Sequence, residues 1–337
     1  MEFVTLEPGD FTYGVGAEIL PGVTRIVAEN PSKFTYRGTG TYIVGDADVA
    51  VVDPGPMLDA HRDALAAALS GRTVRAVLVT HCHADHSPLA AWLRAESGAP
   101  TYAFGPHGAA TAAWDIGSLP DDFGRPDPAG GDGSGDQQTA ESTEPKVEES
   151  TDVDFAPDVV VRTGDRVFTD GSIEITALHT PGHTSNHTCF AMTSRAAGRA
   201  LFTGDHVMGW STTVVSPPDG DMADYMDSLR MVASRRDDVA IPTHGSPISN
   251  PRRYVGRLVD HRLDRERQVL DAVRRGRGSI PEMVTELYAE VRIELHRPAG
   301  ASVLGHLVKL VADGLVVVDE GADGPARPRL DSTFRAV

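Results

Sequence analysis

Residues 80–86 read Thr-His-Cys-His-Ala-Asp-His, and this stretch decides how the rest of the chain is interpreted. It contains four potential metal ligands, which are His81, His83, Asp85 and His86. An apolar run at 75–79 comes directly before it, so we expect a strand to end where the ligands begin. Ligands alternate between faces on an extended segment and spread over a turn in a helix. A strand-to-helix junction can therefore direct the first two ligands at one metal ion and the last two at a neighbouring ion.

Three further candidate ligands follow, each at the end of its own strand-like segment. They are His183 in 180–184, Asp205 in 201–206 and His244 in 241–245. Imidazole nitrogen suits zinc and related cations, and a carboxylate can bridge two of them. Two metal ions roughly 3.5–4 Å apart can share a hydroxide and activate it for hydrolysis. The pattern indicates that Asp205 is the bridge, that His183 completes the first metal site and that His244 completes the second.

The stretch 80–86, with the three later segments in this order, resembles the metallo-β-lactamase superfamily over about residues 15–250. The resemblance implies that His81, His83 and His183 bind metal one, that Asp85, His86 and His244 bind metal two and that Asp205 binds both. It also implies an α/β fold, the αβ/βα sandwich, with the metals at one edge between two sheets. We therefore expect two divalent metal ions as cofactors. Zinc is the element we expect, although the same ligand types also serve iron and manganese.

Other residues near the motifs carry weaker signals. His187 and His206 lie beside motif residues, and we expect them to support ligands or to pack in the core. His61 and His107 fall in helical-looking stretches and carry no functional signal. Cys82 lies between two candidate ligands, and we expect it to be a spacer that points away from the site. With only one other cysteine in the chain, no disulfide framework is indicated.

Length and composition limit the class of protein. A chain of 337 residues can form one large domain and a small one. No basic segment followed by an apolar one opens the chain, and no apolar run approaches the roughly 20 residues that span a bilayer. We therefore expect a soluble, cytoplasmic protein with no membrane partner.

The formal net charge of −17 is unevenly distributed along the chain. Residues 121–158 hold twelve acids against two basic residues, a balance of −10, and residues 252–277 hold nine arginines against four acids, a balance of +5. The segment 120–156 is rich in Gly, Ser, Thr and Glu with almost nothing to bury, which predicts an acidic disordered insertion.

Strand-like and helix-like segments alternate in the rest of residues 1–250, which we expect to form the catalytic domain. The predicted strands are 41–44, 49–53, 75–79, 101–104, 158–161, 173–178, 187–192, 200–203 and 239–241, and the predicted helices are 57–70, 88–97 and 222–234. The pattern of predicted elements changes at residue 251. Residues 251–337 have predicted helices at 261–274, 280–291 and 300–313 and a small hairpin that begins at 315–318. Three helices and a β wing resemble a winged-helix domain, which is our prediction for 251–337.

The chemistry that this layout predicts is metal-assisted hydrolysis, in which a metal-bound hydroxide attacks an acyl or phosphoryl centre. We expect Asp85 to orient the nucleophile or to protonate the leaving group, and His244 to stabilise the developing oxyanion. The acidic composition of the chain and the substrates typical of the superfamily favour an ester or thioester of a small molecule as substrate. A protein that binds metal and has lost catalysis is a third hypothesis, which the complete ligand set opposes.

An alternative substrate is RNA. Segments 203–214, 224–229 and 242–245, together with the tail, are similar to the branch of the superfamily that contains β-lactamase-like protein 2, which implies a single-strand-specific endoribonuclease. The arginines at 252–277 support RNA as a partner because phosphate contacts supply most nonspecific affinity for nucleic acid. Overall acidity and the lack of interleaved aromatic residues oppose it. Gly40 also departs from that branch, where Asn is frequent, so a polar contact near the site would be missing.

Overall fold

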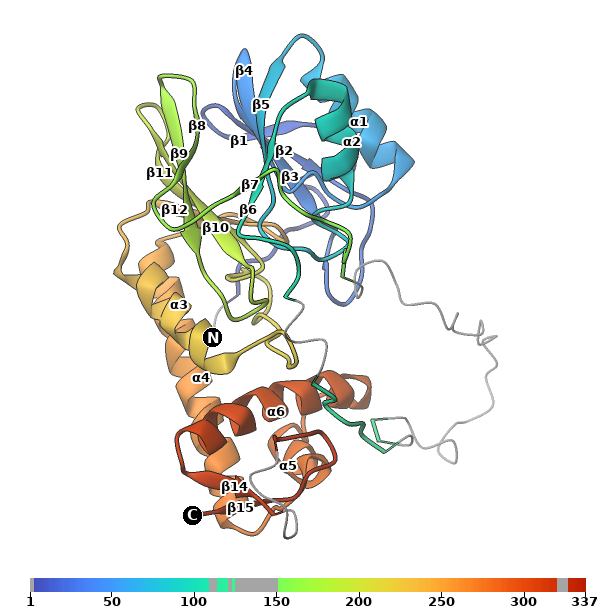
Figure 1. Cartoon of the computed structure of the whole chain (residues 1–337), viewed down its shortest axis with the longest axis vertical. Helices are drawn as coiled ribbons and strands as arrows, with labels where there is room; N and C mark the ends of the chain where they lie inside the picture. Colours follow the sequence, from blue (N-terminus) through green and yellow to red (C-terminus); the bar gives the residue numbers. More distant parts are fainter. Residues whose placement is uncertain (1–2, 109–113, 121–122, 125–150, 320–326) are drawn as a thin grey trace.

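Two β-sheets packed face to face form the upper lobe of the molecule (Figure 1). The computed structural model describes residues 3–108, 114–120, 123–124, 151–319 and 327–337. The first sheet has the order β1-β2-β3-β4-β5-β6-β7, and the second has the order β13-β12-β11-β10-β9-β8. The αβ/βα sandwich that the sequence predicts is confirmed.

The first sheet begins as an antiparallel meander and becomes parallel from β4 onward. Its strands are β1 (Ala17–Leu20), β2 (Val23–Val27), β3 (Gly40–Gly45), β4 (Asp48–Val52), β5 (Thr73–Leu78), β6 (Thr101–Ala103) and β7 (Val159–Val160). All six residues of β3 are buried, because one face packs on the second sheet and the other on helices. The sequence analysis missed β1 and β2.

The second sheet is antiparallel except for the pair β11 and β12, which run parallel. Its strands are β8 (Arg166–Thr169), β9 (Ile173–His179), β10 (Thr188–Ser194), β11 (Gly198–Gly204), β12 (Val239–Pro242) and β13 (Ile248–Ser249). The edge strands β8 and β13 were not predicted. They are short, so they leave little periodicity for sequence to show.

Helices cover the outer face of each sheet. Helices α1 (Asp59–Leu69) and α2 (Leu89–Ser97) pack on the first sheet, and α3 (Met222–Ser234) and the start of α4 (Pro251–Arg274) pack on the second. Buried side chains of both sheets meet between them, with Tyr42 and Phe202 ring centroids 5.4 Å apart. Among the described residues, no helix is both long and apolar enough to cross a membrane.

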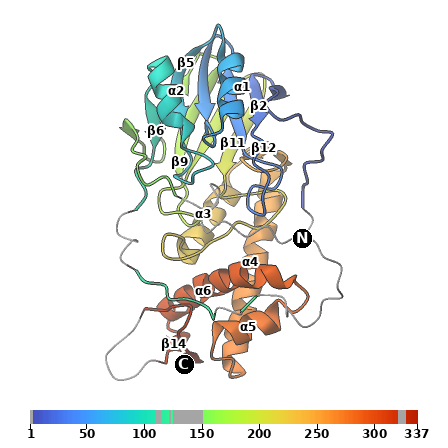
Figure 2. The ribbon, with the colours of Figure 1, turned by 90° about the vertical axis from the view of Figure 1, so that its right-hand side faces the viewer.

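The lower lobe contains the end of α4, α5 (Ile280–Leu287), a 3₁₀ turn (Ile293–Leu295), α6 (His296–Ala312) and a ladder of β14 (Val316–Val318) with β15 (Phe334–Ala336). Helix α6 lies across this lobe on the side that faces the sandwich (Figure 2). The three helices and the ladder enclose their own apolar core. This is the arrangement predicted for a winged helix.

Helix α4 connects the two lobes. It begins ten residues before the predicted position 261, because the side chain of Asn250 accepts a hydrogen bond from Arg253 N and Pro251 occupies the first turn. Tyr254 and Leu258 pack against the sandwich, whereas Val269 and Val273 pack in the lower lobe. A single helix therefore crosses the division that we predict at 250/251.

Most of the predicted acidic insertion at 120–156 lies outside the described residues. Its C-terminal end has defined structure, since Thr151 pairs with His83 as an isolated bridge and Phe155 is buried under α2. The Ser87 hydroxyl donates to the Asp152 carboxylate at 2.7 Å. Thr151, Asp152 and Phe155 thus contact the motif loop or the core, whereas Val153, Asp154 and Ala156 are exposed. For the rest of 120–156, disorder stays a prediction.

Candidate metal centre

The seven predicted ligands lie together at one end of the sandwich. The stretch 80–86 follows β5, His183 follows β9, Asp205 follows β11 and His244 follows β12. The ligand atoms fall into two groups, within each of which they lie inside 4.8 Å of one another. The first group is His81, His83, His183 and Asp205, and the second is Asp85, His86 and His244.

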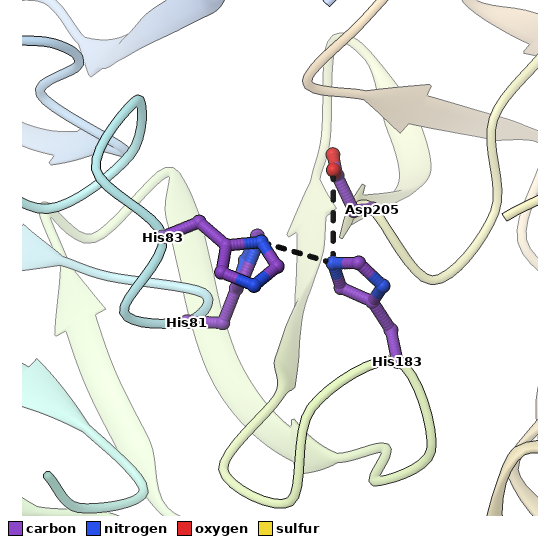
Figure 3. Close-up of side chains that lie close together, drawn as sticks. All are labelled: His81, His83, His183 and Asp205. Carbon is purple, nitrogen blue, oxygen red and sulfur yellow. Dashed lines mark hydrogen bonds and ion pairs between the residues drawn. The ribbon is translucent and has the colours of Figure 1, made fainter. Parts of the chain in front are cut away.

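In the first group, three imidazoles direct nitrogen atoms at one another (Figure 3). His83 Nδ1 lies 2.9 Å from His81 Nε2 and 3.2 Å from His183 Nε2. The Asp205 carboxylate approaches from the other side, with Oδ2 at 3.8 Å from His183 Nε2. Three nitrogen atoms and one oxygen thus surround a single point.

The second group is more deeply buried. Asp85 Oδ2 lies 3.2 Å from His86 Nε2 and 3.1 Å from His244 Nε2. Asp205 Oδ1 lies 3.6 Å and 3.4 Å from the same two nitrogen atoms. The two oxygens of Asp205 therefore face different groups, Oδ2 the first and Oδ1 the second.

The hydrogen bonds of the histidines leave lone pairs pointing into the two groups. His86 Nδ1 bonds to Asp53 Oδ2 at 2.9 Å, His183 Nδ1 to the Val214 carbonyl at 2.7 Å and His244 Nδ1 to the Gly38 carbonyl at 3.2 Å. Because each Nδ1 is the donor, the neutral form of each imidazole carries its lone pair on Nε2. His86 Nε2 and Asp205 Oδ1 are buried and have no hydrogen-bond partner among the described residues. Lone pairs that face one another in this way fit cations bound between them.

Electrostatics differ between the two groups. Burial alone would lower the pKa of His86 and His244, but the carboxylates of Asp85 and Asp205 raise it, so the second group favours positive charge between its side chains. Burial and the neighbouring histidines His86 and His83 hold the pKa of His81 well below its usual value, so its imidazole is neutral. Burial alone would raise the pKa of Asp85, but His86 and His244 hold it well below the usual range, so this carboxyl is ionised. Neutral imidazoles and ionised carboxylates are the forms that bind metal.

Asp53 is a supporting residue that the sequence analysis missed. Its fully buried carboxylate accepts hydrogen bonds from Thr80 N, Thr80 Oγ1 and Thr243 Oγ1 at 2.8, 2.8 and 2.9 Å, besides the bond from His86. It therefore connects β4, the motif loop and the end of β12 around one anion. Asp53 precedes Pro54 at the end of β4, and we had read it only as the end of a strand.

A second supporting contact positions Asp85. Thr39 Oγ1 donates to Asp85 Oδ2 at 3.0 Å, and Thr39 itself is bonded twice to the Asn30 side chain, at 2.9 Å each. A Cβ on the neighbouring Gly40 would lie 3.0 Å from the Thr243 carbonyl and from the Tyr42 hydroxyl. Glycine therefore fits this crowded position, and Asn30 and Thr39 provide a polar contact to the site.

The other residues near the motifs take structural roles. His187 accepts a hydrogen bond from Asp205 N at 3.3 Å, and its Nδ1 bonds to Thr180 Oγ1 at 2.9 Å, so it positions the Asp205 backbone. His206 is buried against Tyr225. Cys82 packs in the core beneath α2, where it accepts a hydrogen bond from Asn186 Nδ2 and burial raises the pKa of its thiol to about 12. These placements confirm the expected support and spacer roles.

A cavity of ≈ 440 Å³ opens beside the two groups and is lined by His83, Asp85, His183, Asp205 and His244. His107 also lines it, with Nδ1 3.5 Å from Asp219 Oδ2. His107 carries no functional signal in the sequence and lies in a bend, not in the helical stretch expected, yet it lines the cavity. No motif indicated it, because only the tertiary fold brings residue 107 back to the motif loop. His61, in contrast, is buried away from this cavity and bonds Thr41 Oγ1 at 2.8 Å.

The fold and the site together define the family. The family model described as Metallo-beta-lactamase superfamily matches residues 36–244, more than half of the chain. A second model, Beta-lactamase associated winged helix domain, matches residues 279–324. The chain therefore belongs to the metallo-β-lactamase superfamily, with a C-terminal winged-helix domain. It is a hydrolase of that superfamily with His and Asp groups able to bind metal.

Individual relatives span most of the chain. It is 29% identical over 317 residues to the atrochrysone carboxyl ACP thioesterase of Passalora fulva, covering 89% of this chain and 78% of that one. It is 27% identical over 325 residues to the beta-lactamase-like protein 2 homolog of Drosophila melanogaster, covering 90% and 95%. A crystal structure of a beta-lactamase domain protein from Burkholderia ambifaria aligns with TM-score 0.71 over 99% of this chain and 97% of that one, at 24% identity, and shows the shared fold.

Proposed function

We propose that the protein is a dinuclear metal-dependent hydrolase of small-molecule thioesters or esters. The observation that carries the proposal is Asp205, whose two carboxylate oxygens face two separate groups of ligands. A carboxylate so placed would bridge two cations. In this proposal the first is held by His81, His83 and His183, and the second by Asp85, His86 and His244. The donor set of nitrogen and carboxylate oxygen suits zinc.

Two such cations, when bound, lower the pKa of water and supply a hydroxide nucleophile near neutral pH. Hydrolysis of a thioester adds the oxygen of water to the acyl carbon and breaks the C–S bond, so the products are a carboxylic acid and a thiol. Asp85 lines the cavity as an ionised carboxylate, so of its two predicted roles it suits orienting the attacking water by accepting a hydrogen bond from it. His244 Nε2 faces the carboxylates of Asp85 and Asp205, which supports a ligand role for His244 more than the predicted oxyanion role.

A small thioester suits the cavity and the relatives. The ≈ 440 Å³ cavity is lined by apolar side chains such as Phe34, Met208 and Val214 beside the polar ligand groups. This mixture suits an acyl group attached to a reactive carbonyl. A curated relative that the chain matches over most of its length is called an ACP thioesterase.

Cleavage of single-stranded RNA is the alternative, and the charges along α4 weaken it. Many of the arginines at 252–277 already form ion pairs within the protein. Arg267 pairs with Asp264, Arg274 with Asp271, and Arg275 and Arg277 with Glu286. The observation in favour of RNA is that Arg252 and Arg253 are exposed at the start of the helix. Phosphate contacts at that end would make cleavage fall steeply with salt.

One experiment separates these functions. Metal-replete protein is assayed with a panel of acyl thioesters and with labelled single-stranded RNA, and its metal content is measured by mass spectrometry. We expect two metal equivalents, thioester turnover and intact RNA. Asp85→Ala should abolish turnover, whereas Asp63→Ala, an exposed acid on α1, should not. RNA cleavage that is lost in Asp85→Ala, with no thioester turnover, would assign the alternative function instead.

A further inference from the structure

A second pocket lies between the sandwich and the C-terminal lobe and adjoins the cavity beside the candidate metal centre. Its volume is ≈ 300 Å³, and Phe34, Met208 and Val214 line both cavities. The sandwich side contributes Trp210 and the loop 211–214, and the C-terminal lobe contributes residues of α4, the 3₁₀ turn and α6. The two cavities are therefore adjacent, as the binding of one substrate across both would require.

This pocket is positively charged in a protein of net charge −17. Lys33, His261, Arg262 and Arg265 line it, and none of the described residues in its lining is an aspartate or glutamate. Two acids beside Arg265 in sequence form ion pairs outside the pocket, Glu266 with Lys309 at 3.2 Å and Asp264 with Arg267. The pocket therefore suits an anionic group.

Arg262 is the most deeply buried of the charged residues that line this pocket. It is only 4% exposed, and the described residues provide it with no ion pair. Its guanidinium donates to the Thr213 carbonyl and lies over the Tyr225 ring, but Nε has no hydrogen-bond partner among the described residues. Burying a cation without a counter-charge is costly, so an anion bound nearby would stabilise it. His261 Nδ1, in the same lining, also has no hydrogen-bond partner among these residues.

Apolar rings accompany the charges. Trp210 stacks on Tyr36 with ring centroids 4.9 Å apart, and Arg265 lies 4.2 Å from the Tyr288 ring centroid. A ligand that combines an amide-bearing chain with a terminal phosphate could lie along such a surface. A thiol of this kind, phosphopantetheine, carries acyl groups both in coenzyme A and on carrier proteins.

We propose that this pocket binds the phosphate-bearing arm of a phosphopantetheine thioester whose acyl group occupies the cavity at the metal centre. The proposal rests on the proposed thioesterase function and names the leaving group for it. Lys33 and Arg265 recognise the phosphate from opposite lobes, and Arg262 supplies the buried charge behind them. The winged-helix domain thereby completes a substrate site that the sandwich begins.

The test compares one acyl group on different thiols. Acetyl and benzoyl thioesters are presented on coenzyme A, on an acyl carrier protein and on N-acetylcysteamine, which has the same thioester and no phosphate. We expect the better of the two phosphate-bearing forms to exceed N-acetylcysteamine by at least about tenfold in kcat/KM, since one charge-assisted contact contributes on this scale. The form that is preferred identifies the source of the arm.

Substitutions assign this preference to the pocket. Lys33→Gln, on the sandwich side, and Arg265→Gln, on the lobe side, should each reduce the ratio of the two kcat/KM values about tenfold. Arg267→Gln is the matched control, because Arg267 is on the same helix, is exposed and does not line the pocket. Calorimetric titration of each protein with free coenzyme A gives a readout that does not depend on turnover, and its Kd should rise about tenfold in the two pocket variants.

The outcomes are distinct. If the wild-type ratio is near one, or if neither pocket variant changes it, the proposal for this pocket is wrong while the thioesterase function stands. If no thioester is hydrolysed on any thiol, both proposals are wrong. If coenzyme A does not bind, and single-stranded RNA binds with an affinity that falls in Lys33→Gln and Arg265→Gln, the pocket is a polynucleotide site and the proposal is overturned.

Discussion

The two lobes of this protein bury histidines in opposite ways. At the end of the sandwich, His86 and His244 have each Nδ1 hydrogen-bonded to a neighbouring acceptor and each Nε2 directed at the carboxylates of Asp85 and Asp205. In the C-terminal lobe, His306 is just as buried, yet neither ring nitrogen has a hydrogen-bond partner among the described residues. The difference teaches that burial alone does not mark a ligand. What marks one is a ring nitrogen that converges with other ligand atoms, and at His86, His183 and His244 the opposite nitrogen is fixed by a hydrogen bond.

The largest effect should come from Asp205, the residue that faces both ligand groups. Asp205→Asn removes the negative charge that would neutralise two cations, so we expect bound metal to fall below two equivalents. Hydrolysis should drop by on the order of 10³-fold, because a metal ion contributes several kcal/mol of transition-state stabilisation. Metal analysis and thioester kinetics measure this. Asp227→Asn, at an exposed acid on α3, is the control that should change neither.

A substitution of Asp53 tests whether the hydrogen bond that fixes His86 Nδ1 is needed for metal binding. In Asp53→Asn, the amide group can accept from His86 or from Thr80 and Thr243, but it cannot accept from all of them as the carboxylate does. We expect metal affinity of the second group to fall about 10- to 100-fold. Competition with a chelator measures it. Asp48→Asn, at the exposed start of the same strand, provides the control, and equal losses in both variants would contradict the assigned role.

A substitution of His306 tests whether a buried histidine outside the ligand groups affects stability and not metal binding. Burial lowers the pKa of His306 from 6.5 to about 4, so below pH 6.5 the unfolded chain binds a proton that the folded lobe does not. The resulting stabilisation is present above pH 6.5 and is lost as the pH falls towards 4, by about 3 kcal/mol in total. Urea unfolding of His306→Leu between pH 7 and pH 4.5 should show a smaller acid loss than the wild type, with unchanged metal content. An identical pH dependence in the two proteins would refute this account.

The smallest effect should come from the contact between the lobes. A Cβ on Gly305 in α6 would lie 3.0 Å from the Val215 carbonyl, next to the residue whose carbonyl binds His183. Gly305→Ala should therefore shift this loop slightly and reduce kcat/KM severalfold, by roughly 1 kcal/mol in the activation barrier. Gly256→Ala in α4 meets no atom within 4 Å and should be neutral or slightly stabilising. Steady-state kinetics of both variants decide whether the lobe affects the site.

Sequence predicted the site better than its surroundings. The ligands could be found because each follows an apolar run, and strand ends at one edge of a sandwich meet. Asp53 also follows a strand, but an isolated acid before a proline has many structural explanations. His107 had no signal at all, since its place in the cavity depends on how the chain returns after β6. The early start of α4 was visible in Asn250 and Pro251, but the charged surface of the helix obscured it.

The sequence by itself determined an α/β alternation and the seven residues that converge, because hydrophobic periodicity and the order of strand ends are local properties of the chain. Its resemblance to a known superfamily implied the sandwich and the winged helix. Only the tertiary structure decided which atoms face one another. It turned the two oxygens of Asp205 towards different groups and placed the Asp53 carboxylate behind His86. It also enclosed Arg262 in a pocket between the lobes. Such contacts join residues far apart in the chain, and they depend on packing geometry that no local pattern encodes.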